Sequence, residues 1–359
     1  MTRFFGYMRL ILLLLALLLS SSDLSADSLE KEIALGKKAS AELEKMWERT
    51  TEPARTAHLD MILSRLTPFT TRPLPFEVRV VRENMINAFS LPGGIVYFTT
   101  GMLDFLRTDA EIAAIMAHEL VHADRRHAVI QAARSTKISA AALALMIASR
   151  GAAAPMILTS MLQVAVTNSY SIELEKEADK EGFKILVSAG FPPAAMVTVL
   201  EAMLFDQMKR PNIDLGVFMT HPEVAERIDY ILDMAEDMKI PMHRKRALNL
   251  LHPALSEEGN FIILKVDSIE VWRYPKGEEG GHALEKAAAA IESSLQMETP
   301  PYDIQVIDLE GVRSLRIGPL IAARDPLPEG VPSLEHLRES LIKALLSARS
   351  EHHSSSYHR

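Results

Sequence analysis

The sequence contains no cysteine among its 359 residues. This absence excludes disulfide bonds and every metal site built on thiolates, so a zinc site here must use His, Asp or Glu side chains. It also excludes a lipoprotein, because the lipid would attach to a cysteine just after the apolar leader. Stability and any metal chemistry must therefore come from packing and from nitrogen and oxygen ligands.

Concentrated positive charge is also missing. The formal net charge is -8, and the lysines and arginines are scattered along the chain. Nucleic acid is excluded as a partner, because binding phosphates needs a concentrated basic surface. Hydrophobic residues make up 48% and charged residues 24%, the balance of a folded globular protein. The length favours two domains and a short tail.

The apolar runs are too short to cross a membrane comfortably, which takes about 20 residues. The run "LILLLLALLL" (10–19) follows Arg3 and Arg9 and precedes small residues, the order of a secretory signal peptide. We expect residues 1–26 to be a cleaved leader and the protein to be exported to the periplasm. An uncleaved membrane anchor is the alternative.

A second apolar region, residues 138–166, allows two interpretations. Neither of its two pieces reaches spanning length, so they are read as a pair of buried helices. The alternative is a membrane-facing hairpin over the active site, which would give the protein a peripheral membrane contact. The sequence leaves the oligomeric state open.

The periodicity predicts an α+β fold that is mainly helical. Helical spacing covers 28–66 with a break at Pro53, and strand-like alternation with a Gly-Gly turn covers 76–98, which predicts a small antiparallel sheet. Helices are expected again over 108–133, 170–190, 193–209 and from 220. We assign residues 27–245 to one domain.

Beyond residue 250 the pattern changes to two strand pairs, "FIILKVDSIEVWRY" and "YDIQVIDLEGVRSLRIG", each followed by a helix. Residues 250–349 are therefore expected to form a small α+β module of unknown role. Residues 350–359 are expected to form a polar, disordered tail. No internal repeat is evident.

The stretch "AHELVHADRRH" places His118 and His122 four residues apart, with Glu119 beside the first. On a helix this spacing puts both imidazoles on one face, where they can hold one metal ion. Zinc makes water more acidic at such a site, and the neighbouring carboxylate can take its proton as general base. A solvated helix face is the alternative for this motif alone. The apolar Leu120 and Val121 favour a buried helix, where unpaired polar groups would be costly.

A catalytic zinc needs a third protein ligand. The extended pattern HExxHxxGxxH is excluded, because it requires glycine at 125 and histidine at 128, where this chain has Arg125 and Ala128. His127 is one residue short of that pattern and would lie on another face of a continuous helix. It is interpreted either as a helix residue paired with a carboxylate or as part of the active site.

The better candidate for a third ligand lies in "ELEKEAD" (173–179). Glu175 and Asp179 are four residues apart and share a helix face. Glu175 could complete a His/His/Glu site, while Asp179 could accept a hydrogen bond from the far ring N–H of a ligating histidine and fix its tautomer. A solvated acidic face paired with Lys176 and Lys180 is the alternative.

Four blocks of the chain, in this order and spacing, resemble the HtpX/BepA-type zinc metallopeptidases, the gluzincin-type family that also contains the CAAX prenyl endopeptidases. They are "NAFSLPGGIVYFTTGML" (87–103), "AHELVHADRRHA" (117–128), "SIELEKEAD" (171–179) and "THPEVAERI" (220–228). The resemblance covers roughly residues 30–240 and stops near 250. One departure is Ile172, where relatives often have an arginine; this weakens an expected ion pair and leaves the ligands in place.

The resemblance implies one catalytic zinc ion and a role for each matching residue. The implied ligands are His118, His122 and Glu175, with Glu119 as general base. Asp179 is expected behind the ligands, and His221 and Arg227 near the site. His221 either donates to the oxyanion of the tetrahedral intermediate or occupies the open metal position in a resting state.

Gly93 and Gly94 permit a sharp turn before the strand that starts with Ile95 and Val96. We expect these four residues to bind substrate, with residues 95–99 forming an edge strand that pairs with an extended peptide. A simple hairpin turn is the alternative, and both can hold together.

These observations favour a zinc metalloendopeptidase that cleaves unfolded or misassembled envelope proteins, a role in protein quality control. The alternative is a periplasmic chaperone-like or scaffolding protein whose zincin site is latent or unused. The complete set of ligands and base favours the enzyme.

Overall fold

The computed structural model describes residues 29–136, 159, 162–164, 166–167, 170–209 and 224–352. The expected leader, His221 and most of the 138–166 segment lie outside these residues. The described chain forms two compact units, and each has its own core. Among the described residues, the first unit contains 29–105 and those within 115–189, and the second contains 106–114, 190–209 and 224–352.

A three-stranded sheet organises the first unit. Its strands are β1 (Glu77–Val81), β2 (Ala88–Leu91) and β3 (Ile95–Thr99), in the order β1-β3-β2. β2 and β3 form the expected antiparallel hairpin, and Gly93 and Gly94 turn it with φ values of 84° and 96°. β1 joins β3 in parallel. The prediction that residues 95–99 form an edge strand is therefore wrong, because β3 is the central strand.

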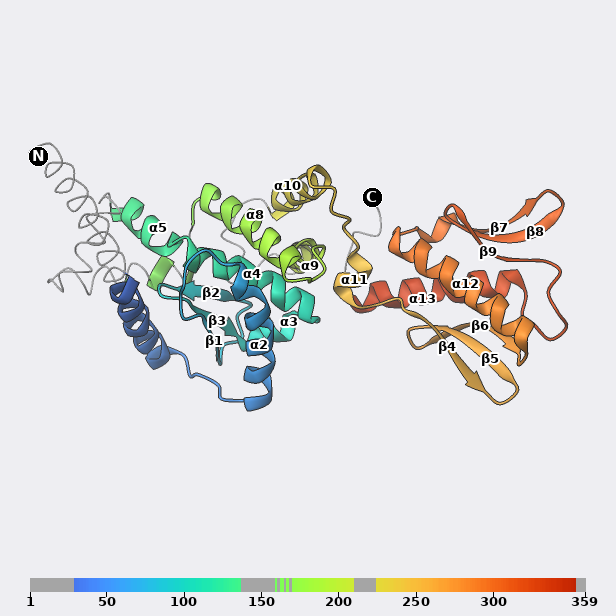
Figure 1. The fold of residues 1–359 in the computed structure, drawn as a ribbon, viewed down its shortest axis with the longest axis horizontal. Coiled ribbons are helices and arrows are strands. Elements are labelled where there is room, and N and C mark those ends of the chain that lie inside the picture. The colour runs from blue at the N-terminus through green and yellow to red at the C-terminus, as the bar shows by residue number, and fades with distance from the viewer. Residues whose placement is uncertain are drawn as a thin grey trace, which may run out of the picture. The chain divides into compact units, whose positions relative to one another are not determined.

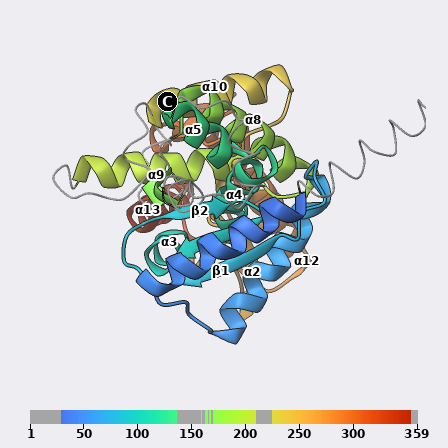
Figure 2. The same cartoon turned by 90° about the vertical axis from the view of Figure 1, so that its left-hand side faces the viewer.

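One face of this sheet is covered by the helix over residues 29–46, drawn in dark blue in Figure 2. Ala39 and Leu43 of this helix share a core with Phe89 and Tyr97 of the sheet. Gly36 allows the helix to approach the β2–β3 turn, since a Cβ atom there would lie 1.7 Å from the carbonyl oxygen of Pro92. The second expected helix, α2 (Pro53–Leu66), begins at the proline that separates the two, as proline favours a first helical turn.

The helix expected over 108–133 is divided in two. α3 (Thr100–Phe105) precedes it, and it then runs as α4 (Asp109–Asp124) and α5 (His127–Thr136). The break lies at Arg126, whose φ of 61° is left-handed and cannot continue an α-helix. Asp124 supports the end of α4, because its carboxylate accepts hydrogen bonds from the backbone N–H groups of Thr71 and Arg72.

The charged helix α8 (Ile172–Ser188) forms as expected and ends before Gly190, which has a φ of 75° typical of a helix C-terminus. Gly182 lies close against α4: a Cβ atom there would be 3.2 Å from both Cα and N of His118, tighter than an ordinary contact. The two helices therefore approach each other backbone to backbone at the first predicted ligand. Within the described residues, none of the helices has the length and apolar content needed to span a membrane.

The second unit contains α9 (Ala195–Lys209), α10 (Val224–Asp237) and α11 (Arg244–Leu248), followed by the C-terminal module (Figure 1). The first half of the module has the strands β4 (Pro253–Glu258), β5 (Phe261–Val266) and β6 (Ile269–Pro275), and the helix α12 (Glu278–Gln296). The second half has β7 (Ile304–Leu309), β8 (Val312–Ile317), β9 (Leu320–Arg324) and α13 (Leu334–His352). The expected α+β module is thus observed with one more strand in each half, and α13 extends into the residues expected to be a tail.

The two halves of the module are structural repeats. Each is a three-stranded antiparallel meander followed by a helix. Each has an irregularity of strand register between the fourth and fifth residues of its middle strand, at Leu264/Lys265 and at Leu315/Arg316. The repeat is hard to see in the sequence because few residues coincide between the halves.

Candidate active site

Helix α4 carries the first three candidate residues of the active site. His118, Glu119 and His122 are 4%, 1% and 2% exposed, so all three polar side chains are buried. The helix is buried here because its neighbouring residues, including Leu120 and Val121, are apolar and themselves fully covered. The interpretation of this motif as a solvated helix face is therefore excluded.

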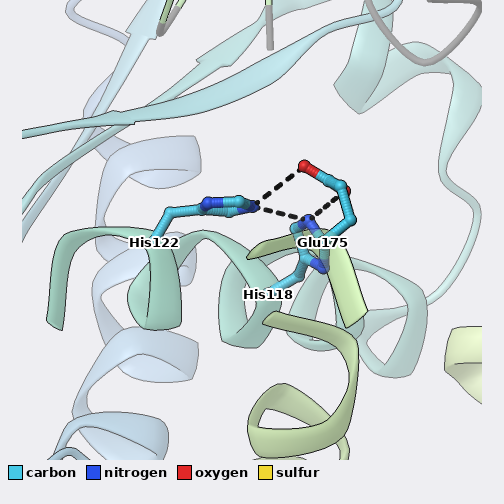
Figure 3. A group of neighbouring side chains, drawn as sticks. All are labelled: His118, His122 and Glu175. Carbon is cyan, nitrogen blue, oxygen red and sulfur yellow. Dashed lines mark hydrogen bonds and ion pairs between the residues drawn. The ribbon is translucent and has the colours of Figure 1, made fainter. Parts of the chain in front are cut away.

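Glu175 of α8 completes a cluster with the two histidines (Figure 3). The Nε2 atoms of His118 and His122 are 3.0 Å apart, and each lies 3.5 Å from a carboxylate oxygen of Glu175. One ligand atom from each residue lies within 4.8 Å of the others. Two imidazole nitrogens and one carboxylate that converge in a buried place are a donor set suited to zinc, so these residues fit such an ion.

Asp179, one turn further along α8, lies behind His118. Its Oδ1 is 2.9 Å from Nδ1 of His118, the ring nitrogen that faces away from Glu175. Burial alone would lower the pKa of His118, but hydrogen bonds to Asp179 and Glu175 outweigh it and raise the pKa to about 10. The two carboxylates thus favour a positive charge next to His118. A bound metal ion would supply such a charge.

His127 lies behind the second histidine, a contact that the sequence did not reveal. Its Nδ1 is 2.9 Å from Nδ1 of His122, and its Nε2 is 3.4 Å from a carboxylate oxygen of Glu177. The side chain is fully buried. Burial lowers the pKa of His127, and the negative charge of Glu177 only partly opposes this effect. In a continuous helix His127 would lie on a different face from His122. The left-handed conformation of Arg126 instead places His127 next to His122.

Tyr170 is a second residue that sequence reasoning missed. Its ring stacks on His122, with ring centroids 4.1 Å apart and planes inclined by 22°. Burial raises the pKa of its hydroxyl well above the usual value, and the charges of Glu119 and Glu175 raise it further. Tyr170 lies just before α8, and no periodic pattern or motif spacing pointed to it.

The remaining expected site residues that the structure describes belong to other elements. Ile95 and Val96 are buried in the central strand and paired on both sides, so neither can pair with a substrate strand, which corrects that prediction. Gly93 and Gly94 form the expected turn. Arg227 is buried on α10, in the other compact unit.

The contact between α8 and α4 gives a first testable result. Gly182→Ala should destabilise the fold by about 1–3 kcal/mol, because the new methyl group presses on the backbone of His118. It should also weaken metal binding, since the contact sets the distance between Glu175 and the histidines. Chemical denaturation and zinc titration would measure the two effects.

Gly281→Ala in α12 is the matched control. There the nearest atom to a new Cβ is Cδ1 of Ile262 at 3.7 Å, an ordinary contact, so stability should be unchanged or improved by up to about 1 kcal/mol. If both alanine variants were equally stable, the close approach of the two helices would be refuted.

The profile of the family described as Peptidase family M48 matches residues 53–235, just over half of the chain. This range contains the cluster of His118, His122 and Glu175, together with Glu119 and Asp179. The C-terminal module lies beyond it.

Curated relatives match a similar share of the chain. The mitochondrial metalloendopeptidase OMA1 of Arabidopsis thaliana is 32% identical over 155 residues, which is 43% of this chain and 30% of that protein. The beta-barrel assembly-enhancing protease of Escherichia coli K12 is 28% identical over 197 residues, which is 52% of this chain and 40% of that protein. The OMA1 protein of Schizosaccharomyces pombe is 28% identical over 191 residues, 52% of this chain and 54% of that protein. The matches thus span about a third to a half of these relatives.

Proposed function

Because this chain belongs to peptidase family M48, we propose that it is a zinc-dependent metalloendopeptidase that cleaves unfolded or misassembled proteins of the cell envelope. The observation that carries the proposal is the buried cluster of His118, His122 and Glu175, with Glu119 next in sequence to the first histidine. A buried set of three ligands with an adjacent carboxylate suits metal-assisted hydrolysis of a peptide bond.

The ligands His118, His122 and Glu175 would hold the zinc ion, which when bound supplies Lewis acidity for the attack of water on the scissile carbonyl. Glu119 takes a proton from the attacking water and later delivers it to the amine that leaves. Its burial beside the ligands keeps this carboxylate away from bulk solvent. Asp179 keeps His118 in the orientation that ligation needs.

Residues nearby have supporting roles in the proposal. His221 would either donate to the oxyanion of the tetrahedral intermediate or occupy the open position in a resting state, and Arg227 would assist it. A substrate strand that pairs with the sheet would have to use β1 or β2, because β3 is central. An extended backbone is accessible in unfolded proteins and not in folded ones, which is why we propose unfolded substrates.

The location rests on the sequence. Residues 1–26 have the order of a secretory signal, and we propose that the mature chain acts in the cell envelope. One of the relatives is named a beta-barrel assembly-enhancing protease, a name that fits this location. We also propose that residues 27–245 form the peptidase domain and 250–349 a separate module.

The direct test is cleavage of casein, an unfolded substrate, by the purified mature protein. We expect fragments with zinc present, loss of cleavage after treatment with a chelator, and recovery when zinc is restored. A tightly folded protein of similar size should stay intact under the same conditions. Zinc-loaded protein that leaves casein intact would favour the alternative, a binding protein with a latent site.

A further inference from the structure

The two histidine ligands differ in what lies behind them. Nδ1 of His118 faces the carboxylate of Asp179. Nδ1 of His122 faces a second imidazole, that of His127, at the same distance of 2.9 Å. A neutral imidazole can either donate or accept through this nitrogen, so the proton positions must be worked out from the partners.

These proton positions follow from the surroundings of both rings. The other nitrogen of His127, Nε2, lies 3.4 Å from Glu177, and a lone pair there would face a negative oxygen, so Nε2 carries a proton. Nε2 of His122 lies in the cluster with His118 and Glu175, and a nitrogen that binds a metal ion must present its lone pair. The proton of His122 is then on Nδ1, and it is donated to Nδ1 of His127.

We propose that His127 is a positioning residue of the metal centre: it accepts a hydrogen bond from Nδ1 of His122, fixes the tautomer of that ligand, and extends the site into a Glu177–His127–His122 chain. The proposal rests on the proposed metal site. It assigns to the second ligand an imidazole partner where the first has a carboxylate. Outer partners of this kind orient a ligand and raise its basicity.

The backbone conformation just before His127 makes this contact possible. Arg126, directly before it, adopts a φ of 61°, which costs an arginine about 1–2 kcal/mol. Its guanidinium Nε lies 2.7 Å from the buried carboxylate of Glu32, in the helix over 29–46, and Glu32 also pairs with Arg72 at 2.6 Å. These ion pairs offset the strain and hold the turn that points His127 at His122.

The ring of His122 is restrained on a second side. Tyr170 stacks on it, while His127 meets it edge to face with ring planes inclined by 81°. Stacking limits the tilt of the imidazole, and the nitrogen–nitrogen hydrogen bond fixes its rotation about the ring axis. Together the two contacts leave one orientation in which Nε2 faces Glu175.

The test compares two variants of the full mature chain, His127→Leu and His127→Asn. Leucine fills the space but accepts no hydrogen bond, whereas the amide oxygen of asparagine can take the place of Nδ1 as acceptor. We expect zinc affinity, measured by competition with a chromogenic chelator, to fall about 10–100-fold in His127→Leu and to recover most of this loss in His127→Asn. The visible spectrum of the cobalt-substituted protein should change in the leucine variant and match the wild type in the asparagine variant.

Three results would overturn the inference. The leucine variant could bind zinc as tightly as the wild type. The two variants could lose the same affinity although both are folded by circular dichroism, which would make His127 a packing residue. If His127→Leu did not fold, Glu177→Gln would serve in its place. Unchanged zinc affinity in Glu177→Gln would refute the proposed Glu177–His127–His122 series of contacts. Glu175→Ala separates this from the proposed function: full zinc binding by that variant refutes the metal site itself.

Discussion

Replacing Glu119 by glutamine should lower the rate of casein cleavage by about 10²–10⁴-fold while zinc remains bound. Glutamine has the size of glutamate but cannot accept the proton of the attacking water. The side chain is buried in a well-packed helix, so an isosteric change should leave the fold unchanged. Single-turnover cleavage of casein and metal analysis of the same preparation would measure both quantities.

Glu111→Gln is the matched control for this variant. Glu111 is a second buried glutamate of α4, and it accepts a hydrogen bond from the backbone N–H of Arg107. Burial raises its pKa, so loss of its charge should be tolerated, and activity should stay near that of the wild type. Normal turnover by Glu119→Gln would refute the general-base role. Lost cleavage with an intact cellular phenotype would favour the alternative function as a binding protein.

Replacing Glu175 by alanine should abolish tight zinc binding and, with it, activity. The loss of affinity should exceed the roughly 10–100-fold expected for outer partners such as His127, because a direct ligand is removed. Zinc should also stop protecting the fold: at a free concentration of about 1,000 times Kd it stabilises the wild type by about 4 kcal/mol, and the variant should gain far less. Metal analysis and thermal unfolding with and without zinc would show this.

Glu173→Ala provides the comparison on the same helix. The side chain of Glu173 is 78% exposed and makes a long 3.7 Å ion pair with Arg134, so its removal should change neither zinc content nor activity. A full complement of zinc in Glu175→Ala would contradict the assignment of the third ligand.

The convergence of His118, His122 and Glu175 could be predicted because short motifs encode it. Residues four apart on a helix share a face whatever the rest of the chain does, and both helices formed where expected. Glu175 was reached by excluding a histidine at 128 and by the resemblance to a known family. The mainly helical α+β fold followed from periodicity in the same way.

The positions of His127 and Tyr170 could not be predicted, because each depends on backbone geometry. An unbroken helix was the simplest interpretation of residues 108–133, and a single left-handed residue, Arg126, changes the direction of the chain between α4 and α5. The central position of β3 depends on a parallel pairing with β1, which local alternation does not encode. The strand β4, "PALSEE", was missed because a proline and two glutamates are unusual in strands.

The two halves of the C-terminal module also share their cores. α13 packs against β6 of the first half as well as β7 of its own, and α12 packs against β9. The indole nitrogen of Trp272, in β6, donates to the carbonyl oxygen of Pro332, just before α13. A proteolytic cut before α13 would therefore do more than trim the end of the chain. It would uncover β6 as well as β7, so we expect the module to fold and to be degraded as one cooperative unit.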